Sequence, residues 1–133
     1  MAVQSFRDLR VWQAGMELVL GVYELTRTFP KSEVYGLSSQ MQRAAVSVPP
    51  NIAEGHTHSS LREYLHFLSI ARSSLAEIET YLELVQRLSY TTPERTRPLL
   101  DLTISIHRQL IALRNSLSTR LGEDPLPYDS TTS

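Results

Sequence analysis

The sequence predicts an all-α protein, an antiparallel up-down-up-down four-helix bundle, and three observations lead to this fold. The chain of 133 residues has only five glycines and lacks the Asn-Gly and Asp-Gly turns that favour β-hairpins. Apolar residues recur at spacings of three and four in four stretches, which is the period of a helix face. The connections between these stretches are short, and short connections favour antiparallel neighbours within one domain.

The first helix is predicted from Phe6 to Thr28. Ser5 and Asp8 match a capping box at its start, and Pro30 ends it because the residue before a proline avoids the α region. Two apolar stripes run along this helix, one more than a bundle core needs. The first stripe is Val11, Gly15, Leu18, Val22, Leu25 and Phe29, and the second is Trp12, Met16, Val19 and Tyr23.

The second helix is predicted to begin at 33–37 and to reach at least Ser47. Its apolar face is Leu37, Met41, Ala44, Ala45 and Val48. Pro49 and Pro50 follow, and a proline inside a helix removes a hydrogen bond and clashes with the preceding turn. The two prolines therefore predict a break or a kink, with residues 51–55 forming either a further helical turn or a turn-rich loop.

The third helix is predicted from a capping box formed by Ser60 and Glu63 to an end near Ser89 or Tyr90. Its apolar residues alternate between spacings of three and four without a slip, which is typical of a heptad seam. They are Leu61, Tyr64, Leu68, Ala71, Leu75, Ile78, Leu82 and Val85.

The fourth helix opens at Thr92 and Pro93, an N-cap threonine followed by a proline at the first helical position. Its predicted seam is Leu99, Leu102, Ile106, Leu110, Leu113, Leu117 and Leu121. Gly122 falls just past the C-terminus of this helix. The bundle is thus predicted over residues 6–121, followed by a disordered tail over 122–133.

Three of the four helices carry more apolar side chains than one core can take. The additional residues of the third and fourth helices are Leu65, Phe67, Ile70, Leu84, Leu100, Ile104 and Ile111. Soluble monomers rarely expose apolar patches larger than a few hundred Å². Self-association into a homo-oligomer is therefore predicted, and the alternative is that wide stripes pack one compact core.

Composition excludes several functional classes. The chain has no cysteine, which excludes disulfides, thiolate catalysis and cysteine-based metal sites. It has no signal peptide and no apolar run long enough to span a membrane, so a cytoplasmic protein is expected. Phosphate-cradling glycine loops and nucleophile elbows are also missing. The prediction is a non-catalytic protein with no cofactor.

Charge is unevenly distributed along a chain whose net charge is only −1. Residues 54–83 hold five Glu against two Arg, whereas residues 84–122 hold six Arg against two acidic residues. Two interpretations stay open: the third and fourth helices pair through complementary charge, or the fourth helix presents a basic face to phosphates. The candidate nucleic-acid contacts are Arg95, Arg97, Arg108, Arg114 and Arg120.

The histidines provide only weak evidence for a metal-binding site. His56 and His58 lie close to Glu54 in a predicted loop, and two histidines with a carboxylate can bind zinc. No other histidine has a defined spacing to them. Glu63 and His66 match one half of a di-iron motif, and the second half is missing. No metal site is therefore predicted.

Several motifs resemble one known family. They are Phe6-Arg7-Asp8-Leu9-Arg10-Val11-Trp12, Tyr35-Gly36-Leu37, Arg43-Ala44-Ala45-Val46-Ser47-Val48-Pro49, Asn51-Ile52-Ala53-Glu54-Gly55 and Ala71-Arg72-Ser73-Ser74-Leu75-Ala76-Glu77. Over about Phe6 to Leu121 the chain resembles the bacterial 23S rRNA intervening-sequence protein family. The resemblance implies an antiparallel four-helix bundle whose second helix continues through a kink at Pro49, so that residues 51–54 are helical. It also implies rings, with the pentamer as the known form.

The motif residues themselves have a structural interpretation. Pro49 and Asn51 would shape a kink, with the asparagine side chain satisfying backbone groups that the proline frees. Gly55 would end the helix. Arg43 and Glu54 would form a buried or an interfacial ion pair. The structural motif set is Arg43, Ser47, Pro49, Asn51, Glu54 and Gly55.

The resulting functional prediction is a non-catalytic, ring-forming scaffold, pentameric by resemblance, that assembles with itself and binds a protein partner. The alternative is a nucleic-acid-binding accessory protein that contacts rRNA or retroelement RNA or DNA through the arginines of the fourth helix. Similarity to the accessory variability proteins of diversity-generating retroelements implies this alternative. Those relatives bind nucleic acid through a strongly basic surface, whereas this chain is slightly acidic.

Overall fold

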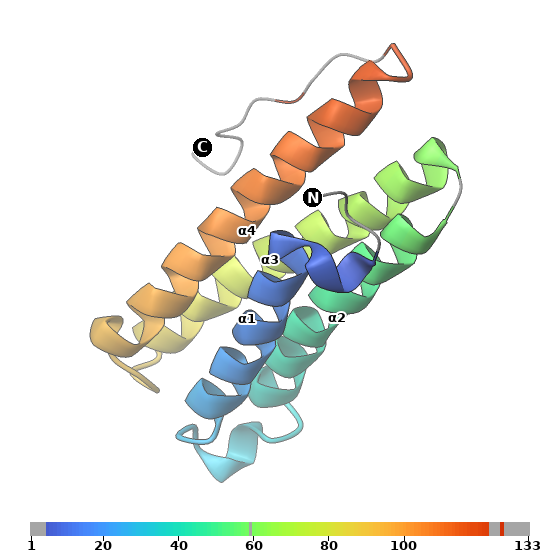
Figure 1. Cartoon of the computed structure of the whole chain (residues 1–133). Coiled ribbons are helices and arrows are strands. Elements are labelled where there is room, and N and C mark those ends of the chain that lie inside the picture. The colour runs from blue at the N-terminus through green and yellow to red at the C-terminus, as the bar shows by residue number, and fades with distance from the viewer. Residues whose placement is uncertain (1–4, 59, 123–125, 127–133) are drawn as a thin grey trace.

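A computed structural model describes residues 5–58, 60–122 and 126, and four long helices make up most of it (Figure 1). The helices are α1 (Arg10–Thr26), α2 (Leu37–Thr57), α3 (Leu61–Arg87) and α4 (Pro93–Thr119). Two short 3-10 turns precede α1 and α2, and they are η1 (Phe6–Asp8) and η2 (Lys31–Glu33). The predicted all-α, four-helix fold is confirmed.

The four helices surround one core. α1 packs against α2 and α4, and α3 packs against the same two helices. In Figure 1 the α1–α2 and α3–α4 connections lie at one end of the molecule and the α2–α3 turn lies at the other, so successive helices are traversed in opposite directions. Within the described part of the chain, none of the helices combines the length and the apolarity that crossing a membrane requires.

Apolar side chains from all four helices fill that core. The heptad seam predicted for α3 is buried from Tyr64 to Val85. The seam predicted for α4 is partly wrong, because Leu102 and Leu113 are only half-buried whereas Thr103 and Ile111 are fully buried. In a helix with about 3.6 residues per turn, spacings of three and four fit more than one row of side chains, so they do not determine which row is buried. Packing against α1 and α3 determines which row of α4 faces the core.

The start of the first predicted helix is also corrected. The capping box of Ser5 and Asp8 is present, but it caps the short turn η1 rather than a long helix. Leu9 then adopts an extended conformation (φ −76°, ψ 126°), and α1 begins only at Arg10. A capping box satisfies the first free N–H groups of a helix and does not determine how far the helix continues.

The second helix passes through both prolines without a break. α2 is continuous from Leu37 to Thr57, so the helical residues 51–54 implied by the family resemblance are confirmed and a loop there is excluded. Asn51 Nδ2 donates to the Ser47 carbonyl at 2.7 Å. Pro49 and Pro50 lack the N–H groups that would donate to the carbonyls of Ala45 and Val46. The Asn51 side chain therefore bonds to the next carbonyl along the helix. A bend at Pro49 stays a prediction.

The end of the chain is described only in part. Gly122 adopts a left-handed conformation (φ 75°), as predicted for a residue past a helix end. The predicted disordered tail lies mostly outside the described residues. Leu126 is described, and its N–H and C=O form 2.8 Å hydrogen bonds with the side-chain amide of Asn115.

The Glu33 carboxylate links the α1–α2 connection to two other segments. It accepts a hydrogen bond from the Leu37 N–H at 3.0 Å, in the first turn of α2, and another from the Tyr90 hydroxyl at 2.7 Å. These bonds, the one from Leu37 first, hold the pKa of Glu33 below its ordinary value of 4.5. The ionised carboxylate thus caps α2, where the N-cap residue Gly36 has no side chain to do so.

Replacing Glu33 by alanine is therefore expected to lower the melting temperature at neutral pH, with the loss disappearing in acid. Because the folded pKa lies below the unfolded one, this stabilisation is complete above pH 4.5 and is lost as the pH falls through the lowered pKa. Thermal unfolding of both proteins, followed by circular dichroism from neutral pH downwards, measures it. Glu17→Ala, at an exposed position of α1, is the control. A difference between wild type and Glu33→Ala that is constant with pH would contradict the charged cap.

Candidate functional site: a polar groove between α2 and α3

Paired polar side chains connect the solvent-facing sides of α2 and α3. The Tyr81 hydroxyl donates to Gln40 Oε1 at 2.9 Å, and Ser74 Oγ donates to Ser47 Oγ at 2.9 Å. The two contacts are seven residues apart on each helix, which is close to two helical turns. They therefore hold one register between α2 and α3.

A surface pocket of about 280 Å³ opens at this seam. Arg43 of α2 and Glu77 of α3 are exposed at its rim, and Ser74 is buried in its floor. Neither rim residue makes an ion pair or a hydrogen bond with another side chain of the described ranges. We call the pocket the α2–α3 groove. Its lining residues are Gln40, Arg43, Ala44, Ser47, Ser74, Glu77 and Tyr81.

The groove has the composition of a binding surface rather than of a reactive centre. Its two serine hydroxyls bond to each other, and that of Ser74 also donates to the Ile70 carbonyl. No histidine lies among the lining residues to activate them. Arg43 and Glu77 offer one fixed positive and one negative charge. Such an arrangement can hold polar or charged groups by hydrogen bonding.

Four residues of the predicted motif form one line on α2. Arg43, Ser47, Asn51 and Glu54 follow at spacings of four, four and three, which place them on one helix face. The predicted ion pair between Arg43 and Glu54 is wrong within the chain. The two residues are eleven positions apart on one helix, about 16 Å along its axis.

The other two motif residues point inward and serve packing. A Cβ atom at Gly15 of α1 would lie 3.5 Å from Pro49 Cγ, so this buried proline sets the approach of α1 to α2. Gly55 does not end the helix as predicted, because α2 continues to Thr57. It is buried, and a Cβ atom there would lie 2.8 Å from Cδ1 of Tyr64. Its role is the close approach of α3.

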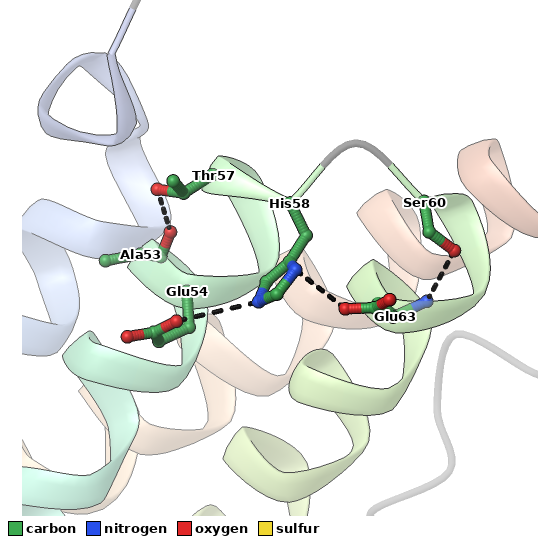
Figure 2. A network of polar contacts seen from close by, with 6 residues as sticks. All are labelled: Ala53, Glu54, Thr57, His58, Ser60 and Glu63. Carbon is green, nitrogen blue, oxygen red and sulfur yellow. Dashed lines mark hydrogen bonds and ion pairs between the residues drawn. The ribbon is translucent and has the colours of Figure 1, made fainter.

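A histidine network closes the end of the seam (Figure 2). His58 Nδ1 lies 2.7 Å from a Glu63 carboxylate oxygen, and His58 Nε2 lies 3.7 Å from a Glu54 oxygen. The His58 ring also stacks on Phe67, with ring centroids 5.1 Å apart. Ser60 Oγ accepts from the Glu63 N–H, so the Ser60 half of the predicted capping box is present while the Glu63 side chain contacts His58.

His56 and His58, predicted to lie in a loop, do not converge, and His56 lies within the last turn of α2. His56 Nδ1 lies 3.4 Å from the Tyr64 hydroxyl, whereas His58 lies between the two glutamates. Within the described ranges no three His, Asp or Glu side chains gather into a group that could hold a metal ion. Their role in this structure is to join the end of α2 to the start of α3.

The arginines predicted as nucleic-acid contacts are distributed around α4. At about 100° per residue, Arg97 and Arg108 lie on one side, and Arg95 and Arg120 lie on roughly the opposite side. Arg114 lies between the two sides and is half-buried, while the other four are exposed. These five arginines therefore do not lie together on one face of α4.

Sequence reasoning missed the α3 half of the groove. Ser74 and Glu77 belong to a recognised motif, but their importance depends on the helix that faces them. A signal was present, because Ser74, Glu77 and Tyr81 repeat on α3 the spacing of Gln40, Arg43 and Ser47 on α2. Only the register between the two helices converts these two lines into one groove.

Comparisons with known proteins agree with this fold. A crystal structure of a protein of unknown function from the S23 ribosomal protein family of Bacteroides thetaiotaomicron VPI-5482 superposes with a TM-score of 0.71. It is 24% identical and covers 78% of this chain and 97% of its own, so it shows the fold alone. A comparison with curated proteins gives no match. The sequence profile of the 23S rRNA-intervening sequence protein matches residues 7–112, most of the helical bundle, and the chain therefore belongs to that family.

Proposed function

We propose that the protein is a non-catalytic scaffold that assembles into a ring through an apolar face of α1. The observation that carries the proposal is an exposed apolar face of that helix, formed by two residues of its second stripe, Met16 and Tyr23, together with Leu20. Met16 is 44% exposed, Leu20 71% and Tyr23 41%. We call these three residues the α1 patch.

The α1 patch lies on the side of its helix that faces largely away from the core. Trp12 and Val19 lie between the patch and the core-facing side and are half-buried against the core. Around the helix the middle of the patch lies about 150° from the row of Leu18 and Val22, which is fully buried. Because apolar surface in water is unfavourable, this face is best explained by a second protein surface that covers it.

A ring is the expected arrangement if the α1 patch contacts a different surface of the next chain, and Val46 of α2 and Leu84 of α3 are exposed apolar residues outside the patch. A head-to-tail contact between two different surfaces repeats until the rotation closes, whereas a two-fold contact stops at a dimer. The ring size of five follows from the family resemblance. The groove serines bond to each other and to a backbone carbonyl rather than to a histidine, which supports a non-catalytic role in which the α2–α3 groove binds a partner protein.

The test is the mass in solution, measured by light scattering after gel filtration. The wild-type protein is expected to have several times the 15.1 kDa mass of one chain. Met16→Glu combined with Leu20→Glu places charge in the α1 patch and is expected to reduce the mass to that of one chain. Ala112→Glu, which adds a glutamate at an exposed position of α4, should leave the assembly intact. A wild-type mass of one chain would remove the scaffold proposal.

Nucleic-acid binding is the alternative outcome. Fluorescence anisotropy with labelled RNA and duplex DNA, at low and at physiological salt, separates the two functions. The scaffold proposal expects no binding that weakens steeply with salt. Salt-dependent binding would reflect phosphate contacts and would favour the α4 arginines as the functional surface.

A further inference from the structure

Polar atoms of two side chains are buried between α3 and α4 without a hydrogen-bond partner among the described residues. His107 is 7% exposed, and neither of its ring nitrogens has a hydrogen-bond partner among the described residues. The Nε atom of Arg72 is buried and equally without a partner there. Most buried polar groups in proteins are hydrogen-bonded, so two such groups in one seam require a physical explanation.

The register between the two helices brings these side chains together. Thr96 Oγ1 donates to Gln86 Oε1 at 2.8 Å, which fixes α4 against α3 near the connection between them. Arg72 on α3 and Leu110 on α4 each lie fourteen residues from that contact, which is about 21 Å along the helix. His107 lies three residues before Leu110. Arg72 and His107 therefore occupy neighbouring positions of the seam.

Two positively charged side chains, Arg72 and Arg114, lie close enough in this seam to influence each other. Burial lowers the pKa of Arg72, and the charge of Arg114 lowers it further. Burial and then the charge of Arg72 lower the pKa of His107. Glu79 lies on this side of α3, one heptad or about 10 Å from Arg72, and Glu83 lies about 16 Å from Arg72 on the same side, where it pairs with Arg87. Burial raises the pKa of Glu79, which is the opposite of what a nearby cation would do.

We infer that Arg72 and His107 form a binding site for a phosphate group. The Nε edge of a guanidinium takes two oxygens of an oxyanion side by side. A tetrahedral phosphate then directs a further oxygen towards a second donor, here a ring N–H of His107. A carboxylate would have both oxygens engaged by the arginine. This site does not depend on ring assembly, and its test is independent of the mass measurement.

The experiment is a titration of the protein with inorganic phosphate at constant ionic strength, with ³¹P line broadening as the readout. Wild type is expected to broaden the phosphate signal in a saturable manner. Arg72→Met and His107→Phe keep most of the side-chain volume and remove the donors, and each should weaken binding by about tenfold or more. Arg72→Lys, which keeps the charge and loses the fork, should behave like Arg72→Met.

The control is Arg97→Met, which removes an exposed arginine of α4 outside the seam and should bind phosphate like wild type. Circular dichroism confirms that each variant is folded, and Arg72→Lys keeps the test valid if Arg72→Met unfolds. No saturable broadening by wild type, or equal losses in Arg97→Met and Arg72→Met, would overturn the site. Displacement of phosphate by a short single-stranded oligonucleotide would assign it to backbone phosphates, and failure to displace it would assign it to free phosphate.

Discussion

Replacing Ile106 by alanine is expected to lower the free energy of unfolding by about 3 kcal/mol, within the roughly 2–5 kcal/mol range for large-to-small changes in a core. Ile106 is fully buried in the middle of α4, in contact with the core shared by all four helices. The substitution removes three carbon atoms and leaves a cavity that close-packed neighbours cannot fully fill. Urea unfolding followed by circular dichroism, at one fixed protein concentration, measures the loss.

Leu102→Ala is the matched control on the same helix. Sequence periodicity placed Leu102 in the seam, whereas the structure leaves it half-buried. Its truncation removes less apolar contact and is expected to cost about 1 kcal/mol. Equal losses for the two variants would contradict the side of α4 that the structure directs to the core.

Replacing Gly55 by alanine is expected to destabilise the protein by about 1–2 kcal/mol, because overpacking costs roughly 1–3 kcal/mol. A Cβ atom at this position would lie 2.8 Å from Cδ1 of Tyr64 and 3.2 Å from Cβ of Phe67. The Tyr64 ring is buried and Phe67 Cβ belongs to a rigid part of α3, so neither gives way easily. The better helix propensity of alanine, worth up to about 1 kcal/mol, offsets only part of this cost.

Gly21→Ala is the control for the same substitution on α1. A Cβ atom there would lie 2.3 Å from Cδ2 of Leu99, which is nominally a worse clash. That atom is the far end of a flexible side chain beside a surface pocket of about 340 Å³, so Leu99 can turn away. Gly21→Ala is therefore expected to be neutral or stabilising. Destabilisation by Gly21→Ala as large as that by Gly55→Ala would contradict the distinction between rigid and movable neighbours.

Much of the fold could be predicted from the sequence because helix periodicity is a local property. The seam of α3 was predicted residue by residue, since its apolar positions keep one phase from Tyr64 to Val85. The prolines of α2 were a different case, because local physics at Pro49 and Pro50 predicted a break or a kink, and the break does not occur. Packing of α1 and α3 against both flanks of α2 stabilises a continuous helix.

The candidate site was only half visible in the sequence. Arg43 and Ser47 were identified on α2, and their partners across the groove, Glu77 and Ser74, were not. Arg72 and His107, in the seam between α3 and α4, were not identified as site residues either. A side chain becomes part of a site when residues distant in sequence face it, and no local pattern contains that information.

The sequence by itself determined that this chain forms four long helices, which of their faces are apolar, and to which family it belongs. Spacing along one helix is enough for these properties, because each turn repeats every 3.6 residues whatever lies beside it. Only the tertiary structure decided which stripe of α1 stays exposed, which row of α4 is buried, and which polar residues meet between helices. Those depend on the register and rotation of one helix against another, which are set by close packing over the whole core.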